Sequence, residues 1–457
     1  MEVLAFFALL GDRKIMEKKL CRKEFVKYVT LNVLGMIGVS CYILADTFFV
    51  ANGLGADGLT ALNLAIPVYS LVHGSGLMFG VGGTTRYSIL RGQKKQKSAD
   101  EIVTNTVFFA IALAVVYVLC GIFLSEKITM ILGADDSVFQ LTNTYIRVIL
   151  LFAPTFMLND VFLCLVRNDG NPGLSMAAML IGSFSNIVLD YIFIFSLQMG
   201  IFGAVLATGL APVISMMVLS LHLKRKERFH LLRMKVSIRL CGKCIVLGIP
   251  SLITEVASGI VMIVFNLIIL KLEGNMGVAA YGVVANLSLV VVSIYTGVAQ
   301  GMQPLISRAY GDKDARCIKR FLCYAMVTIL VLSVVIYFCI FVYADFIVQI
   351  FNSESDQQLQ EMAETGLRMY FSAVAFIGFN VILSMYFSAT EKSLPAQVIS
   401  LLRGFILMIP MAVLLSKIAG LTGVWLTVAV TEGLVAGVGI LLYGKYRTAI
   451  VQGSAKG

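Results

Sequence analysis

Twelve long apolar segments constrain the fold of this chain more than any other feature of its sequence. Each is about 20 residues or longer, which is enough for a helix to cross the hydrocarbon core of a bilayer. They lie near residues 28–50, 58–84, 103–124, 143–166, 173–196, 202–223, 245–271, 278–305, 321–351, 365–389, 396–416 and 421–444. Hydrophobic residues make up 59% of the chain and charged residues only 14%, so no soluble domain is expected. The sequence predicts an all-α polytopic membrane protein with twelve transmembrane helices.

The basic residues predict how the chain is oriented in the membrane. Of 36 Lys and Arg residues, 30 fall in segments on one side, and only Lys127, Lys271 and Lys417 fall on the other. Cytoplasmic loops carry the excess of basic residues in membrane proteins, so we expect a multi-pass protein of the cell membrane with both termini in the cytoplasm. The net charge of +10 then serves orientation and does not indicate nucleic-acid binding. Trp425, at the start of the last segment, is expected to anchor it at the membrane interface.

The two halves of the chain repeat each other. The stretch "GLTALNLAIPVYSLVHGSGLMFGVGGTTRYSILRGQK" (58–94) aligns without a gap with "GVAAYGVVANLSLVVVSIYTGVAQGMQPLISRAYGDK" (277–313), so that Gly58 meets Gly277 and Gly82 meets Gly301. Six segments per copy is an even number, so both copies have the same orientation in the membrane. The predicted units are an N-terminal cytoplasmic segment (1–27), an N-lobe (28–223), a cytoplasmic inter-lobe loop (224–244), a C-lobe (245–444) and a cytoplasmic tail (445–457).

Two six-helix lobes related by a parallel repeat are typical of transporters that work by alternating access. A channel is less favoured, because no segment resembles a filter loop and the repeat is twofold. An integral membrane enzyme is also disfavoured, because the sequence shows no cluster of metal ligands, no nucleophile with a base and no nucleotide motif. Cys241 and Cys244 have no second pair with which to complete a zinc site. The sequence therefore predicts a transporter with neither a structural metal nor a cofactor.

Two acidic residues lie late in outward-running apolar segments of the N-lobe, and a carboxylate within a membrane helix costs roughly 2.5–3.5 kcal/mol on insertion scales. Asp46 lies late in the first segment and Asp190 late in the fifth. Asn186 precedes Asp190 by one helical turn and shares its face, and Thr208 lies at a similar depth in the sixth segment. The alternative is that a neighbouring polar group satisfies each acid separately. Because the repeat has Phe265 where Asp46 falls, we expect a cation-binding cluster in one lobe only.

Other polar residues within the segments leave two interpretations open. Glu255, Arg403 and Glu432 lie at interior depth in the C-lobe. They would form either a second cation or substrate site, or a buried ion pair that holds the lobe together. In the N-lobe, His73 is expected to be satisfied by a hydrogen bond rather than to relay protons. Asp160 is interpreted as a contact between helices or as part of a gate.

Several stretches resemble the multidrug and toxic compound extrusion (MATE) transporters. They are "LADTFFVANGLGADGLTALNLAIPV", "SNIVLDYIFIF" followed by "GIFGAVLAT", and "GVAQGMQPLISRAYGDKD". The resemblance covers nearly the whole chain and is greatest for the bacterial branch that contains the DinF- and MepA-like proteins. It implies export of lipophilic, often cationic compounds driven by inward flow of H⁺ or Na⁺. It also implies that the N-lobe cluster of Asp46, Asn186, Asp190 and Thr208 is the coupling site.

Two departures from the family limit what the resemblance implies. The first segment has no proline, so a mechanism in which a helix-1 proline bends on protonation is not expected here. A sodium-coupled branch uses a helix-7 glutamate together with a helix-10 aspartate. Glu255 matches the glutamate, but the tenth segment contains no acid. We therefore expect H⁺ as the coupling ion, with Na⁺ at the same oxygen ligands as the alternative.

The predicted function is export of small amphipathic compounds, cations in particular, in exchange for H⁺. A rival within transport is a flippase for lipid-linked saccharides, which would need a strongly basic cavity, whereas only Arg403 lies deep within a segment. The expected partners are the lipid bilayer and small-molecule substrates, with no nucleic acid. We expect the protein to work as a monomer.

Overall fold

The computed structural model describes residues 2–225, 228–232, 236–352 and 356–455, and within these ranges the chain forms helices and turns without a β-strand. The α-helices are α1 (Glu2–Gly92), α2 (Gln96–Phe123), α3 (Ser125–Ile131), α4 (Phe139–Leu151), α5 (Ala153–Asn168), α6 (Pro172–Tyr191), α7 (Gly200–Leu219), α8 (Ile238–Gly311), α9 (Ala315–Phe351), α10 (Gln357–Tyr370), α11 (Val374–Ala389), α12 (Ser393–Leu401) and α13 (Met408–Ala455). Short π- or 3₁₀-helical stretches follow four of them, namely η1 (Ile192–Ser196), η2 (Ser220–Lys224), η3 (Phe371–Ala373) and η4 (Leu402–Ile406). The predicted all-α fold is confirmed.

Three of the long helices contain an internal break at a glycine. The backbone is non-helical at Gly55 (φ 67°, ψ −157°), at Gly274 (φ 63°, ψ −154°) and at Gly420 (φ 55°, ψ −136°). A positive φ is readily adopted by glycine and strained for residues with a side chain. Gly55 and Gly274 are equivalent in the internal repeat, because they are separated by the same interval as Gly58 and Gly277. The repeat therefore extends from the sequence to the backbone conformation of its turns.

The chain doubles back at these breaks. Tyr42 and Tyr69 lie on either side of Gly55, and their hydroxyl oxygens are 3.2 Å apart. Phe265 and Tyr281 lie on either side of Gly274, and their rings stack with centroids 5.6 Å apart. Each of these long helices is therefore two antiparallel segments joined by a tight turn.

The number of membrane spans depends on how these broken helices are counted. Within the described residues, eight helices are long and apolar enough to cross a membrane, or nine if the bent pair α4 and α5, which meet at 49°, forms one span. If the bent pair counts as one span, and α1, α8 and α13 each count as two spans divided at their breaks, the nine spans become the twelve that the sequence predicts.

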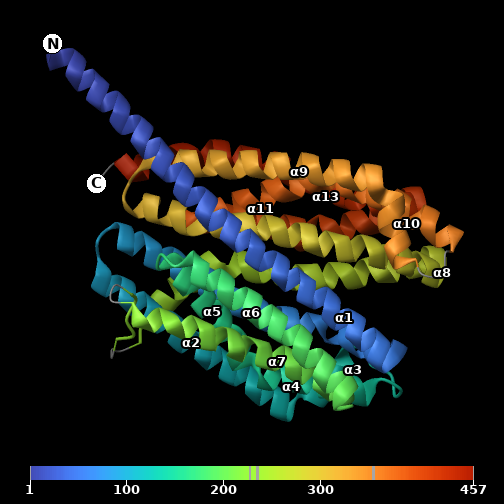
Figure 1. The fold of residues 1–457 in the computed structure, drawn as a ribbon. Coiled ribbons are helices and arrows are strands. Elements are labelled where there is room, and N and C mark those ends of the chain that lie inside the picture. Colours follow the sequence, from blue (N-terminus) through green and yellow to red (C-terminus); the bar gives the residue numbers. More distant parts are fainter. Residues whose placement is uncertain (1, 226–227, 233–235, 353–355, 456–457) are drawn as a thin grey trace.

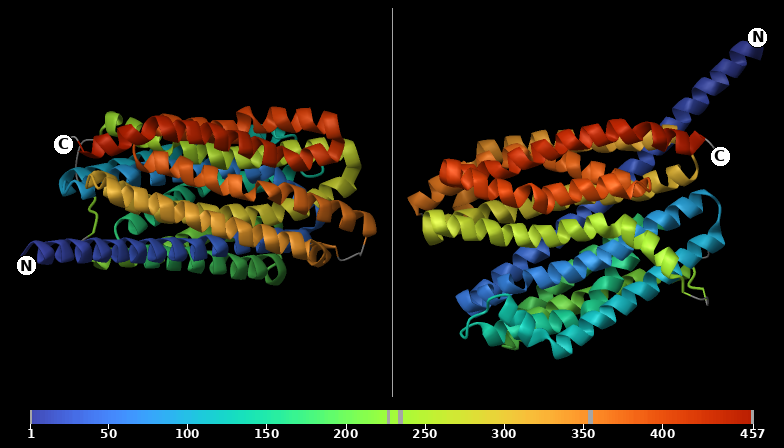
Figure 2. Two further views of the ribbon diagram at one scale, coloured as in Figure 1. Left: turned by 90° about the horizontal axis from the view of Figure 1, so that it is seen from above. Right: turned by 180° about the vertical axis from the view of Figure 1, so that it is seen from behind.

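The helices gather into two bundles that lie side by side (Figure 1). Most of α1 and all of α2 to α7 form one bundle, and α8 to α13 form the other. Both termini lie at the same end of the molecule, and the turned views of Figure 2 agree on this placement. Helix α8 begins at Ile238, within the predicted inter-lobe loop 224–244. That loop and the predicted tail 445–457 each include residues outside the described ranges, and the predicted domain boundaries stay predictions.

The two bundles touch through glycines near the end that holds the termini. A methyl group at Gly82 would collide with the carbonyl oxygen of Cys244 and approach Gly248. At the position equivalent to Gly82 in the repeat, a methyl group on Gly301 would lie 2.8 Å from the Cα atom of Val29. Val29 and Gly248 are themselves equivalent in the repeat. The same close backbone contact is therefore made twice, once on each side of a pseudo-twofold axis.

Candidate functional site

Two buried carboxyl groups meet inside the N-lobe. Asp46 comes from the first half of α1 and Asp190 from the last turn of α6, and their exposed fractions are 8% and 0%. Their side chains lie close enough to interact with each other. The Oδ1 atom of each has no hydrogen-bond partner among the described residues. The role of this pair in binding a cation stays a prediction.

Asn186 and Thr208 complete the predicted cluster. Asn186 is fully buried one turn before Asp190. With its amide nitrogen turned toward the acid, it donates to Asp190 Oδ2 at 3.1 Å, and its oxygen accepts from the backbone N–H of Thr208 at 3.2 Å. The Thr208 hydroxyl donates to the carbonyl oxygen of Ala204 at 3.1 Å. The four residues predicted from the sequence are thus neighbours in space, contributed by α1, α6 and α7.

A line of aromatic and polar side chains extends from the acid pair toward α5. Tyr42 lies one turn before Asp46 in α1, and its hydroxyl is 3.2 Å from that of Tyr69. The Tyr69 ring stacks on His73, with centroids 5.7 Å apart and planes at 10°. His73 Nδ1 is 2.9 Å from Asp160 Oδ2. His73 thus lies at ion-pair distance from Asp160, which makes a contact between helices, but the geometry of this contact is not that of the hydrogen bond expected for His73. The sequence singles out neither tyrosine, although each lies four residues before a polar member of the line.

The C-lobe acids do not form one group. Arg403 donates through Nε and Nη2 to Glu432 Oε1 at 3.1 and 2.9 Å, and Asn380 donates to Glu432 Oε2 at 2.7 Å. This ion pair joins η4 to α13 and is nearly buried. Glu255 lies elsewhere, packed against Gly74 of α1 and close enough to His73 to interact with it electrostatically. Two of the three predicted C-lobe residues are paired, and the third faces the N-lobe.

Arg167 is a buried cation at the contact between the lobes. Its exposed fraction is 2%. Its Nη1 donates to Asn32 Oδ1 at 2.6 Å and to Gln300 Oε1 at 2.9 Å, and its Nη2 lies 3.3 Å from Cys164 Sγ. No ion pair with a carboxylate is found for it in the described part of the chain. By sequence Arg167 belongs with the basic residues of a cytoplasmic loop, and only the structure places it in the interior.

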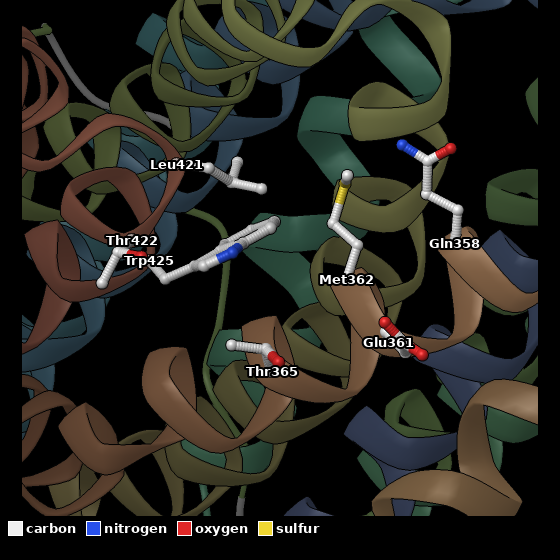
Figure 3. A pocket seen from close by; sticks show the side chains of 7 residues that line it. All are labelled: Gln358, Glu361, Met362, Thr365, Leu421, Thr422 and Trp425. Carbon is white, nitrogen blue, oxygen red and sulfur yellow. The ribbon is translucent and has the colours of Figure 1, made fainter.

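A separate cavity of about 270 Å³ opens between α10 and the second half of α13 (Figure 3). Met362 and Trp425 face each other across it. The exposed fraction of Trp425 is only 1%, and its ring lies 6.2 Å from that of Tyr281. Trp425 therefore packs inside the C-lobe and is not the interface anchor expected from its position in the sequence. None of the predicted coupling residues lines this cavity.

A membrane protein of two helical lobes, one of which buries an acid pair at interior depth, has the architecture of a solute transporter. Residues 33–192 and 250–414 match the MatE family model, so this chain belongs to the MatE family. The resemblance drawn from the sequence is confirmed. As a member of this family the protein is a multi-pass membrane transporter and not an enzyme.

Individual relatives agree over most of the chain. The multidrug export protein MepA of Staphylococcus aureus (strain MRSA252) is 26% identical over 423 residues, which cover 92% of this chain and 93% of MepA. MepA of Staphylococcus saprophyticus is 25% identical over 425 residues, with the same coverage. These values show common ancestry over the full length of both lobes.

Solved structures share the fold. A transporter of the MOP superfamily from Pyrococcus furiosus superposes with a TM-score of 0.88 at 23% sequence identity, covering 94% of this chain and 96% of that one. A multidrug resistance MATE family transporter described as outward-facing also gives a TM-score of 0.88 at 23% identity, with coverage of 94% and 97%. At this identity the likeness establishes the fold alone.

Proposed function

We propose that this protein exports small amphipathic compounds, cations in particular, in exchange for H⁺ by alternating access. The observation that carries the proposal is the buried pair of neighbouring acids Asp46 and Asp190, whose Oδ1 atoms have no hydrogen-bond partner among the described residues. A proton shared by the two carboxyl groups would remove the repulsion between them. The names of the MepA relatives, which are multidrug export proteins, support the substrate class.

The coupling follows from the charge of the acid pair. When the pair loses its proton, two carboxylates face each other with the unpaired Oδ1 atoms of both buried. Two like charges at short range in a poorly solvated site are unfavourable, so this state favours conformations in which a cation lies nearby. A proton entering from outside removes that preference and favours release of a cationic substrate. No cofactor is needed beyond the coupling ion.

Sodium remains the alternative coupling ion. Asp46, Asp190, the Asn186 carbonyl and the Thr208 hydroxyl are oxygen ligands of the kind that hard cations prefer. Two neighbouring carboxyl groups can share one proton, which favours H⁺. The flippase alternative loses support, because the Arg403 guanidinium that it would need for a pyrophosphate is already bound by Glu432.

The same proposal places the protein in the cell membrane as a monomer with both termini in the cytoplasm. The asymmetric distribution of Lys and Arg between the two sets of loops supports the cytoplasmic placement of the termini. The end that holds both termini, where the lobes meet through Gly82 and Gly301, then faces the cytoplasm.

Reconstituted vesicles test the function. The protein is placed in liposomes with a fluorescent lipophilic cation, ethidium, and a pH gradient or a Na⁺ gradient is imposed, one at a time. We expect the pH gradient alone to drive transport, and Asp46→Asn to abolish it because the amide keeps the size of the side chain and loses its titratable charge. Transport driven only by Na⁺ would make the cluster a sodium site. Transport by Asp46→Asn at the wild-type rate would remove Asp46 from the coupling mechanism.

A further inference from the structure

A second cavity, of about 490 Å³, lies where the N-lobe and the C-lobe meet, at the end that holds the termini. Arg86 from α1 lines it on one side. Arg239 and Lys243, from the first turns of α8, line it together with Glu391 from the turn between α11 and α12. Its volume lies in the range of roughly 300–1,000 Å³ that is typical of small-molecule sites. None of the residues proposed for coupling contributes to it, so this site is independent of the proposed transport mechanism.

The charges in this cavity are unbalanced. Arg86 Nη1 forms an ion pair with Glu391 Oε1, and this pair bridges the two lobes. Arg239 and Lys243 lie one turn apart on the same face of α8. Neither forms an ion pair with any carboxylate in the described ranges. With Glu391 engaged by Arg86, the two remaining cations are available for an anion.

Exposed apolar side chains lie in the lining of this cavity or next to its lining residues in sequence. Val246, which lines the cavity, is 43% exposed. Ile238 precedes Arg239 and is 82% exposed, and Leu394 follows the cavity residue Ser393 and is 61% exposed. Large apolar side chains with this exposure beside unpaired basic residues match the boundary between lipid headgroups and acyl chains. A soluble anion would gain nothing from them.

We propose that this cavity binds the phosphate-bearing headgroup of an anionic phospholipid. Arg239 and Lys243 contact the phosphate, and Val246 lies beside the start of the acyl chains. Basic pockets between transmembrane helices on the cytoplasmic side are known to bind anionic headgroups. These contacts all come from α8 of the C-lobe, while the Arg86–Glu391 pair closes the cavity on the side of the N-lobe. A soluble phosphomonoester or phosphodiester would present the same kind of anion to Arg239 and Lys243 as a lipid headgroup does.

The test measures lipid binding by the full chain in a neutral detergent. Phosphatidylglycerol and phosphatidylcholine are added separately, and bound lipid is counted by native mass spectrometry while Tm is followed in parallel. We expect phosphatidylglycerol to bind and raise Tm, and the double variant Arg239→Gln with Lys243→Gln to bind it at least about tenfold more weakly. Lys243→Arg keeps the charge and should retain binding. Both substituted residues are exposed, so folding is not at stake.

A matched control removes the same charge from the same end of the molecule. Lys95→Gln with Lys97→Gln changes two exposed basic residues that do not line the cavity, and it should leave lipid binding unchanged. An equal loss in this control would show that only overall charge attracts the lipid and would overturn the proposal. Equal binding of phosphatidylcholine would do the same. Glycerol 1-phosphate distinguishes the two sources of phosphate: a Tm shift equal to that of phosphatidylglycerol would assign the cavity to a soluble ligand.

Discussion

Arg167 of the N-lobe donates a hydrogen bond to Gln300 of the C-lobe at 2.9 Å, and both side chains are buried. The same Nη1 group also binds Asn32 of α1. At the positions that the repeat makes equivalent to Asn32 and Gln300, the chain has Ser251 and Val81, so this bridge exists on one side of the pseudo-twofold axis only. The lobes pack together at the symmetric glycine contacts, and the Arg167 hydrogen bonds stabilise this contact on one side.

Arg167→Gln should loosen this contact. A shorter neutral side chain cannot reach both acceptors, and hydrogen bonds from a charged group contribute about 1.5–3 kcal/mol each. The thiol of Cys164, which is 2% exposed beside Arg167, should then react with a membrane-permeant maleimide on the order of tenfold faster, the effect of about 1.4 kcal/mol. Mass spectrometry of the labelled Cys164 peptide in proteoliposomes gives the rate. Arg368→Gln, which removes an arginine paired with Glu364 within α10, is the control and should leave the rate unchanged.

Arg403 and Glu432 allow the two interpretations of the C-lobe acids to be separated. If the pair is structural, Glu432→Gln should destabilise the protein by about 3–5 kcal/mol, because it leaves a nearly buried guanidinium without a counter-ion. The double variant Arg403→Met with Glu432→Met should recover much of that loss. Thermal unfolding in detergent measures both. If these residues instead form a second cation site, both variants should keep a Tm close to that of the wild type. Both variants should then lose transport.

The repeat made much of the fold predictable from the sequence. Gly55 and Gly274 mark equivalent turns, and the spacing of apolar segments places the helices around them. The proximity of the residues proposed for coupling was also predictable, because position along a segment gives depth in the membrane. Depth placed Asp46, Asp190 and Thr208 at one level, and the structure brings them together.

The position of a residue along a segment predicts its depth in the membrane but not the direction in which its side chain points. The contacts that the sequence failed to predict follow from this. Glu255 has a depth similar to that of Arg403, but rotation about the axis of α8 turns it toward His73 of the other lobe. The partners of Arg167 were not predictable either. Gln300 is 133 residues away along the chain, and an arginine at the end of a segment is indistinguishable in sequence from a loop cation.

The orientation prediction can be tested with introduced cysteines. Lys224 and Asn52 are both exposed. If a cysteine introduced at either position does not react with an impermeant reagent, the cause is therefore the side of the membrane on which it lies and not burial. In intact cells an impermeant maleimide added outside should label Asn52→Cys and leave Lys224→Cys unlabelled. After permeabilisation both should react. Labelling of Lys224→Cys alone in intact cells would reverse the proposed topology and place the lobe contact at Gly82 and Gly301 outside.

Substrate binding should release protons if Asp46 and Asp190 share one. Binding is reciprocal: if protonation weakens the affinity for a cationic substrate, the substrate must weaken the affinity for the proton by the same factor. Adding ethidium to the detergent-purified protein in weak buffer should therefore acidify the medium, as followed by a pH-sensitive dye. Asp46→Asn should lose the signal, because it removes one partner of the pair that holds the proton. Glu361→Gln, which removes an exposed carboxyl group of α10, should keep it. Substrate binding without proton release, together with an affinity that falls as Na⁺ rises, would instead identify the oxygen ligands around Asp190 as a sodium site.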